Sequence, residues 1–184
     1  MYMNLSLLIL LPLLTALLIL LSKTVAQIRV IGFAGSIVQL IASIGLLNFY
    51  MQQRAAGNTN TYLFENNFIW FKALHINYHV GIDGISMAMI LLTSLIVVAG
   101  ILVSWTMEKL TKEYFFLLIL LSVGAYGFFI SLDLFTLFFF LEVAVIPKFL
   151  LIGIWGSGQK ENSAMKLALM LMAGFSFEIG RAHV

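Results

Sequence analysis

The sequence predicts an all-α membrane protein: a multi-pass bundle of five transmembrane helices and a truncated sixth, with a short extracytoplasmic hairpin. Three observations predict this fold. First, 62% of the 184 residues are hydrophobic and only 10% are charged, whereas soluble domains carry roughly 25% charged residues. Second, the apolar residues form runs of about 20, long enough for a helix to cross about 30 Å of hydrocarbon. Third, all but one of the complete runs lack ionisable side chains, as expected for helices that face lipid.

The composition also excludes several classes of function. The chain has no cysteine, so it forms no disulfide and supplies no thiolate for zinc or an iron–sulfur cluster. Any redox centre is therefore expected in another chain. The formal net charge is only +2 and the basic residues are scattered, which argues against nucleic-acid binding.

The predicted helices follow in chain order. The first apolar run could be a signal peptide, but no positive charge precedes it and no small-residue cleavage site is evident, so we interpret it as a helix. Residues 1–51 then hold two helices, 52–84 form a loop, and 85–177 hold three helices and part of a sixth. The spans are Leu5–Ser22, Ile31–Met51, Ile85–Met107, Tyr114–Leu132, Leu134–Trp155 and a run that begins near Ala164.

Lysine and arginine residues predict the orientation, because short cytoplasmic loops carry their excess. The loops after the first and third spans contain Lys23, Arg29, Lys109 and Lys112, and Lys160 and Lys166 flank the junction of the fifth and sixth spans. The opposite loops contain only Arg54 and Lys72. The N-terminus is therefore expected on the extracytoplasmic side.

The loop Gln52–Asp83 contains a pattern typical of a half-buried strand. Apolar and polar residues alternate over 74–80, and Phe68–Phe71 could form the partner strand. A short hairpin over the helix ends is expected. His75 and His79 would share a strand face, which makes metal binding one interpretation. However, no Asp, Glu or third His lies in the same run. Solvated or hydrogen-bonded histidines are therefore the better interpretation.

Glu142 is the strongest functional candidate in the chain. At 1.5 Å per residue it lies about 13 Å from Asp133 and about 20 Å from Gly156, near the middle of the bilayer. A charge at that depth costs from roughly 3 to beyond 10 kcal/mol. Desolvation favours the protonated carboxyl and a nearby cation favours the carboxylate, so Glu142 is suited to take up and release a proton. A carboxyl permanently paired to hold helices together is the alternative.

Pro147 and Lys148 are candidates for a polar path in the same helix. Six residues turn a helix by about 600°, so Lys148 and Glu142 face directions about 120° apart and lie about 9 Å apart along the axis. They are not expected to pair. Pro147 removes the hydrogen bond to the Val143 carbonyl, which is then free to serve a water or a polar path. Lys148 could relay a proton, reach towards the surface, or anchor the helix.

Two further features have structural interpretations. Asp133 precedes an apolar run, the position of a residue that caps a helix N-terminus. Small residues in two spans permit close helix packing: Gly32, Gly35, Gly124, Ala125 and Gly127.

These residues carry a resemblance to a known family. The matching segments are Gly81–Ser86, Leu132–Phe135, Phe140–Glu142, Val145–Pro147 and Gly153–Gly156. In this order they resemble the N-terminal part of chain M, an antiporter-like subunit in the membrane arm of proton-translocating NADH:quinone oxidoreductase, respiratory complex I. The resemblance covers about residues 1–177.

The resemblance implies a role for one residue and none for another. Glu142 matches the essential glutamate of the family, which pairs with a lysine on a later, broken helix. Lys148 stands where many relatives have an uncharged residue, so no catalytic role is transferred to it. NADH, FMN, iron–sulfur clusters and quinone are implied for other subunits, and no cofactor or metal is expected in this chain. The implied partners are neighbouring antiporter-like and small membrane subunits, the lipid bilayer and protons.

Residues 178–184 depart from the family. They interrupt an apolar helix and resemble the translation of a common sequencing adapter. We expect them not to be native sequence, so Glu178 and His183 are excluded as site residues. The remainder is expected to be the first third or so of the subunit.

The sequence thus predicts a proton-translocating membrane subunit of a respiratory NADH:quinone oxidoreductase in the inner membrane of a bacterium. It would help couple NADH oxidation and quinone reduction in other chains to proton transport, without redox chemistry of its own. A large subunit of a multi-chain sodium/proton antiporter would contain the same glutamate and is the alternative. A membrane scaffold without a transport role is a third interpretation.

Overall fold

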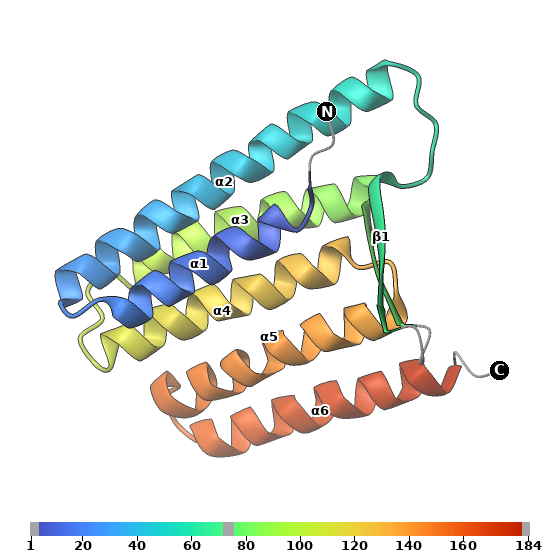
Figure 1. Ribbon diagram of the computed structural model, residues 1–184. Coiled ribbons are helices and arrows are strands. Elements are labelled where there is room, and N and C mark those ends of the chain that lie inside the picture. Colours follow the sequence, from blue (N-terminus) through green and yellow to red (C-terminus); the bar gives the residue numbers. More distant parts are fainter. Residues whose placement is uncertain (1–3, 72–75, 182–184) are drawn as a thin grey trace.

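The computed structural model describes residues 4–71 and 76–181, which form six helices and two strands. Figure 1 shows the helices side by side, alternating in direction, with the hairpin across one end. The helices are α1 (Leu7–Leu21), α2 (Val25–Ala55), α3 (Gly84–Val103), α4 (Thr111–Ile130), α5 (Leu134–Trp155) and α6 (Lys160–Arg181).

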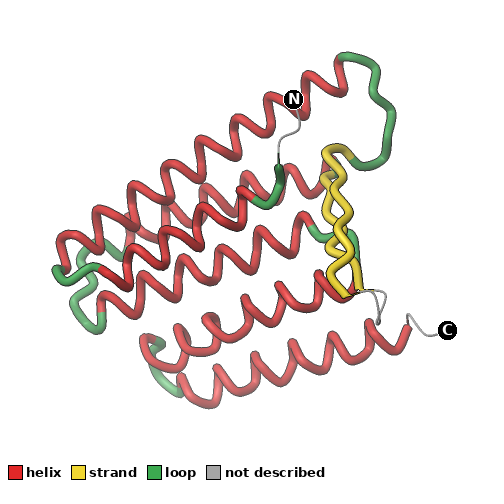
Figure 2. The backbone as a smooth tube through the Cα atoms, in the orientation of Figure 1, coloured by secondary structure: helices red, strands yellow, loops and turns green. Residues whose placement is uncertain are grey.

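Helix α4 is central to the arrangement. It packs against α1, α2, α3 and α5, while α6 packs against α5. The first four helices therefore form one group, which we call the α1–α4 bundle. Helices α5 and α6 extend it on one side, as the tube in Figure 2 shows.

The helices suit a membrane. Helices α2 to α5 are long and apolar enough to span one, and α1 is apolar but has only 15 residues, about 22 Å at 1.5 Å per residue. Large apolar side chains also cover the outside of the helices, as with Val103 (83% exposed) and Ile85 (71%). Such a surface is expected in lipid rather than water. The predicted all-α membrane class is confirmed.

The observed helix ends differ from the predicted spans where polar residues begin a helix. Helix α2 begins at Val25 rather than Ile31, because the Thr24 hydroxyl accepts a hydrogen bond from the Gln27 N–H at 3.3 Å. Helix α6 begins at Lys160 rather than near Ala164, and it continues to Arg181. No break in the helix therefore marks the boundary predicted before residue 178. His183 lies outside the described residues.

The predicted hairpin has two antiparallel strands, β1 (Leu63–Phe71) and β2 (Ile76–Ile82), with Phe68 opposite Tyr78. The hairpin is joined to the turn between α4 and α5. The Leu132 N–H donates to the His79 carbonyl at 2.9 Å, and Val80 bridges to Ser131. A hairpin strand therefore fixes the segment from which α5 starts. Its extracytoplasmic location stays a prediction.

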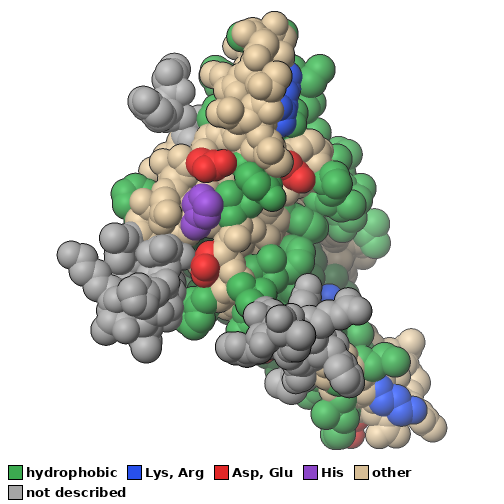
Figure 3. Space-filling view, turned by 90° about the vertical axis from the view of Figure 1, so that its right-hand side faces the viewer, with side chains coloured by type: hydrophobic (Ala, Val, Ile, Leu, Met, Phe, Trp, Pro, Cys, Tyr) green, Lys and Arg blue, Asp and Glu red, His purple; other side chains and the backbone are tan. Residues whose placement is uncertain are grey.

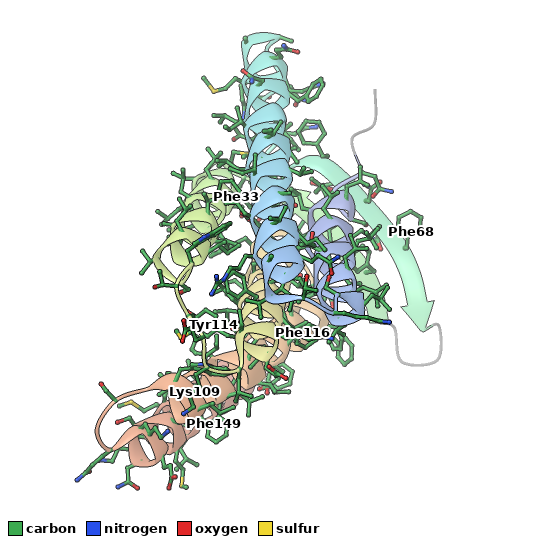
Figure 4. The ribbon with its side chains drawn as sticks, turned by 90° about the vertical axis from the view of Figure 1, so that its left-hand side faces the viewer. Phe33, Phe68, Lys109, Tyr114, Phe116 and Phe149 are labelled. Atoms are coloured by element: carbon green, nitrogen blue, oxygen red, sulfur yellow. The ribbon has the colours of Figure 1, made fainter. Side chains whose placement is uncertain are left out.

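Basic residues gather at the other end of the bundle, as the loop pattern predicts. Arg29 Nη2 donates to the Met107 carbonyl and Lys112 Nζ to the Ser22 carbonyl, both at 3.1 Å. Trp155 Nε1 donates to the Lys109 carbonyl at 2.8 Å. Figure 4 looks onto this end and shows Lys109 close to Tyr114. These bonds tie the loops between helices together. The side of the membrane that this end faces stays a prediction.

Candidate functional site

Glu142 lies inside α5, about 12 Å from Leu134 and about 20 Å from Trp155 along the axis. Its side chain is partly buried. Glu142 and Gly153 are about three turns apart and share a face of the helix. A Cβ on Gly153 would lie 3.9 Å from that of Ala164 in α6. Glu142 therefore lies on the side of α5 that faces α6.

Glu142 has no hydrogen-bond or ion-pair partner among the side chains that the structure describes. Because α5 and α6 are antiparallel, the α6 turn at the depth of Glu142 lies near residue 175. Side chains of α6 beyond residue 173 are outside the described set. A partner for the carboxyl would have to come from that turn or from other helices.

The start of α5 is held by Asp133, as predicted. Its carboxylate accepts hydrogen bonds from the N–H groups of Phe135 at 3.1 Å and Thr136 at 3.2 Å. These are donors that the first turn of a helix cannot satisfy internally, and a carboxylate also suits the positive end of the helix dipole. Asp133 therefore fixes the start of α5 and, with it, the position of Glu142 along the helix.

Small residues of α4 set the distance between α4 and α5, as predicted. A Cβ on Gly124 would lie 2.7 Å from the Ala144 Cβ and 2.8 Å from the Phe140 carbonyl oxygen. A Cβ on Gly127 would overlap the Phe140 ring. The two helices thus meet nearly backbone to backbone on the side of α5 away from Glu142, which leaves the carboxyl clear of the α1–α4 bundle.

Pro147 and Lys148 occupy a different part of α5. Pro147 is buried within the helix and has no N–H to give to the Val143 carbonyl. Lys148 is partly buried and lines a cavity of about 170 Å³ between α4, α5 and α6. Glu142 does not line this cavity, and the two side chains form no ion pair. The geometry agrees with the predicted 120° separation around the axis.

The sequence prediction missed a buried polar cluster in the α1–α4 bundle, formed by Gln39, Ser43, Ser94 and Tyr126. We call it the Tyr126 cluster. The Tyr126 hydroxyl donates to Ser94 Oγ at 3.0 Å, and Ser94 Oγ lies 2.7 Å from Ser43 Oγ. Gln39 Nε2 donates to the Leu8 carbonyl at 3.1 Å. The cluster therefore links all four helices at a depth without water.

A sequence signal for part of this cluster exists. Pro12 has no N–H for the carbonyl four residues earlier, which is that of Leu8. A polar side chain in a neighbouring apolar span is the expected replacement donor, and Gln39 is such a residue.

The sequence prediction for His75 and His79 missed one acidic neighbour. His79 Nε2 lies 3.7 Å from Glu65 Oε2, across the hairpin. Figure 3 shows a histidine beside acidic side chains on this face. Glu65 belongs to the partner strand, so a search along one run could not find it. His75 lies outside the described residues, and the described residues contain no group of three or more side chains suited to a metal.

Two side chains near the hairpin have shifted pKa values. The Ser86 N–H donates to Asp83 Oδ1 at 2.7 Å at the start of α3. This bond holds the pKa of Asp83 below its ordinary value of 3.8. Burial raises the pKa of Tyr78, against the opposing effect of its hydrogen bond with Ser6. The hairpin and the start of α1 thus form a partly buried contact.

Comparisons with curated proteins identify relatives over most of the chain, although no protein-family model matches it. The chain is 33% identical to F(420)H(2) dehydrogenase subunit M of Methanosarcina mazei over 162 residues, 88% of this chain and 32% of that protein. It is 32% identical to NADH-ubiquinone oxidoreductase chain 4 of Arabidopsis thaliana over 180 residues, 96% of this chain and 35% of that protein. It is 31% identical to NADH-quinone oxidoreductase subunit M of Rickettsia prowazekii over 121 residues, 65% of this chain and 25% of that protein. The chain therefore spans about a third of the length of the first two relatives.

Solved structures share the fold. A chain of respiratory complex I from Thermus thermophilus with bound NADH matches with a TM-score of 0.76 and 21% identity, over 93% of this chain and 33% of that one. A chain of the membrane-bound sulfane sulfur reductase, an archaeal respiratory membrane complex, matches with a TM-score of 0.69 and 20% identity, over 94% and 35%. At these identities the matches establish the helical membrane fold.

Proposed function

Because the chain is homologous to subunit M and chain 4 of the NADH-quinone oxidoreductases, as its motifs predict, we propose that it forms part of a proton-translocating membrane subunit of such a complex. Electron transfer from NADH to quinone in other chains would supply the free energy. The redox cofactors NADH, FMN, iron–sulfur clusters and quinone would all lie in those chains. Neighbouring antiporter-like and small membrane subunits would be its partners.

The proposed location is the inner membrane of a bacterium, with the N-terminus on the extracytoplasmic side. The segregation of basic residues supports this orientation. They tie the loops together at the end opposite the hairpin, and the cytoplasmic side is where such residues concentrate. The hairpin would then lie on the extracytoplasmic side.

The position of Glu142 is the observation that carries the proposal. The carboxyl lies deep within α5, on the side facing α6 rather than the α1–α4 bundle. In a low dielectric the neutral acid is favoured, and an approaching cation reverses that preference. A lysine from a later helix, as the family resemblance implies, would make Glu142 release its proton on approach and take one up on retreat.

Proton transport against the membrane potential requires free energy, which a reaction in other subunits would supply. Moving one charge across the membrane costs about 2.3 kcal/mol per 100 mV. The family resemblance implies that the redox cofactors lie in other subunits. We therefore assign the proton-transfer step to this chain and the energy-releasing step to its partners. The names of the relatives favour this assignment over the sodium/proton antiporter.

The test is the Glu142→Gln variant of the complete subunit, assembled in its complex. Glutamine keeps the size of the side chain and cannot exchange a proton. Loss of a positioned proton-transfer group typically costs about 10²–10⁴-fold in rate, so proton pumping in sealed vesicles should fall by at least about tenfold. The subunit should remain assembled.

Glu108→Gln is the matched control, because Glu108 is an exposed carboxyl in the loop between α3 and α4. It should pump as the native protein does. If Glu142→Gln also pumps normally, Glu142 plays no part in transport and the scaffold interpretation replaces the proposal.

A further inference from the structure

Lys148 faces a cavity whose place in the fold is defined by three helices. The cavity of about 170 Å³ is bounded by α4, α5 and α6. Gly124 and Ala125 of α4 and Ala144 of α5 lack bulky side chains, and Leu171 of α6 lines the opposite wall. Small residues thus keep the helices close together while leaving a space beside the lysine.

Lys148 is the one polar side chain among the described residues that line the cavity. Its ammonium group has three donors and no acceptor. The described lining of α4 and α6 contains no titratable or charged side chain that could pair with it. A dry ammonium in an apolar site is strongly unfavourable. Without a described partner, the three donors of the amine need water in the cavity.

The usual direction of long side chains on a helix leads us to expect the Lys148 amine deep in the membrane. Long side chains on a helix lean towards its N-terminus. For Lys148 this direction leads away from the basic end of the bundle, towards Ala144 and Leu141, which also line the cavity. Lys148 is therefore poorly placed to reach the nearer helix end.

The space beside Lys148 is large enough for water. A cavity needs about 10–15 Å³ of volume open to a water-sized sphere to hold one water molecule, and this cavity has about 170 Å³. Lys148 supplies the polar group that such water would contact. Pro147 also leaves the Val143 carbonyl without the N–H that it would accept from, but neither residue lines the cavity.

We propose that the cavity between α4, α5 and α6 is water-filled and that Lys148 exchanges a proton with this water. The inference rests on the proposed function, to which it adds a second proton-exchanging residue. In the step, an Nζ–H bond breaks and its electron pair stays on Nζ. The proton adds to a water oxygen, and that water passes one of its protons along the chain. The neutral amine is recharged when a proton arrives by the reverse route.

Two variants of the complete subunit in its complex test the proton exchange. Lys148→Met removes the amine, and Lys148→Arg keeps the positive charge on a group that does not give up its proton. Both should lower proton pumping in vesicles by at least about tenfold at unchanged assembly, since loss of an acid–base group typically costs about 10²–10⁴-fold. Normal pumping by either variant would overturn the exchange role. Glu142→Gln, measured in the same vesicles, reports separately on the proposed function.

Hydration is tested independently by thiol labelling, in which the peptide around position 148 contains only the introduced cysteine, because this chain has none of its own. Lys148→Cys is compared with Ile146→Cys, since Ile146 is 60% exposed on the outside of α5. A thiol ionises, and reacts with a methanethiosulfonate reagent, only where water reaches it. Cys at position 148 should react at least about tenfold faster, as quantified by mass spectrometry of the peptide. Equal or slower labelling at 148 would show that the cavity is dry and overturn the proposal.

Discussion

Both prolines of the chain lie inside membrane helices, and the two surroundings treat the unpaired carbonyl differently. In α1, Pro12 leaves the Leu8 carbonyl without an intrahelical donor, and Gln39 Nε2 donates to it at 3.1 Å. In α5, Pro147 leaves the Val143 carbonyl in the same condition, and no described side chain donates to it. The α1–α4 bundle therefore supplies a side-chain donor at its proline, whereas the described side chains around α5 supply none. The Gln39 amide oxygen itself is buried without a described partner.

The side chains involved differ in the same way. The Tyr126 cluster uses an amide and hydroxyl groups that remain neutral in the membrane. Helix α5 carries a carboxyl and an amine, neither with a described partner. Paired neutral groups stabilise contacts between helices, whereas ionisable side chains inside a membrane helix usually serve a function. We infer that the bundle supplies rigidity and that α5 supplies proton exchange.

The largest expected effect comes from breaking the contact that joins the two regions. Gly127→Ala places a methyl group against the Phe140 ring, and overpacking of this kind costs about 3 kcal/mol. The thermal midpoint of the purified complex in detergent, and the amount of assembled subunit, should both fall.

Gly45→Ala is the matched control, since no neighbouring atom lies within 4 Å of a Cβ at that position. It should remain within about 1 kcal/mol of the native stability. Equal effects of the two substitutions would show that α4 and α5 are not held as closely as the geometry requires.

A smaller effect is expected from removing the side-chain donor at Pro12. The Leu8 carbonyl would then lack a described side-chain donor, as the Val143 carbonyl does at Pro147. Gln39→Leu leaves the buried Leu8 carbonyl without its side-chain donor, which costs about 2 kcal/mol. Pro12→Ala restores the intrahelical N–H for the same carbonyl. In the double variant, Gln39→Leu should therefore cost about 1 kcal/mol or less. The measurement is the denaturation midpoint of the four proteins. Strict additivity would mean that Gln39 does not replace the missing helix bond.

The same two regions show what the sequence could predict. Apolar runs predicted the helices, of which α2 to α5 are long and apolar enough to span a membrane, because hydrophobic length is a property of each segment alone. The depth of Glu142 and the capping role of Asp133 followed from counting along one helix. The Tyr126 cluster was missed because its bonds join residues on different helices, which no single-segment pattern records.

Two further features depended on contacts between elements. Glu65 lies beside His79 only through the register of the hairpin. The cavity beside Lys148 depends on small residues of α4 and on the position of α6. Helix periodicity correctly separated Lys148 from Glu142 but could not show what Lys148 faces instead.

The smallest expected effect concerns a helix cap of the α1–α4 bundle and shows that its ends, unlike its interior, respond to pH. The Asp83 carboxylate caps α3, and its bond with the Ser86 N–H lowers its pKa in the folded protein. Its contribution, about 1 kcal/mol for a cap, is therefore complete above the ordinary value of 3.8 and is lost as the pH falls through the lower folded value.

Asp83→Asn keeps a capping oxygen that does not titrate, so its thermal midpoint should lose less than that of the native protein as the pH is lowered from about 6 to about 3. Asp83→Ala should be less stable at the higher pH and should lose little on acidification. The two variants together separate the cap from its charge. Parallel pH profiles for the native protein and Asp83→Asn would mean that the Asp83 carboxylate adds nothing beyond the hydrogen bond that asparagine also forms.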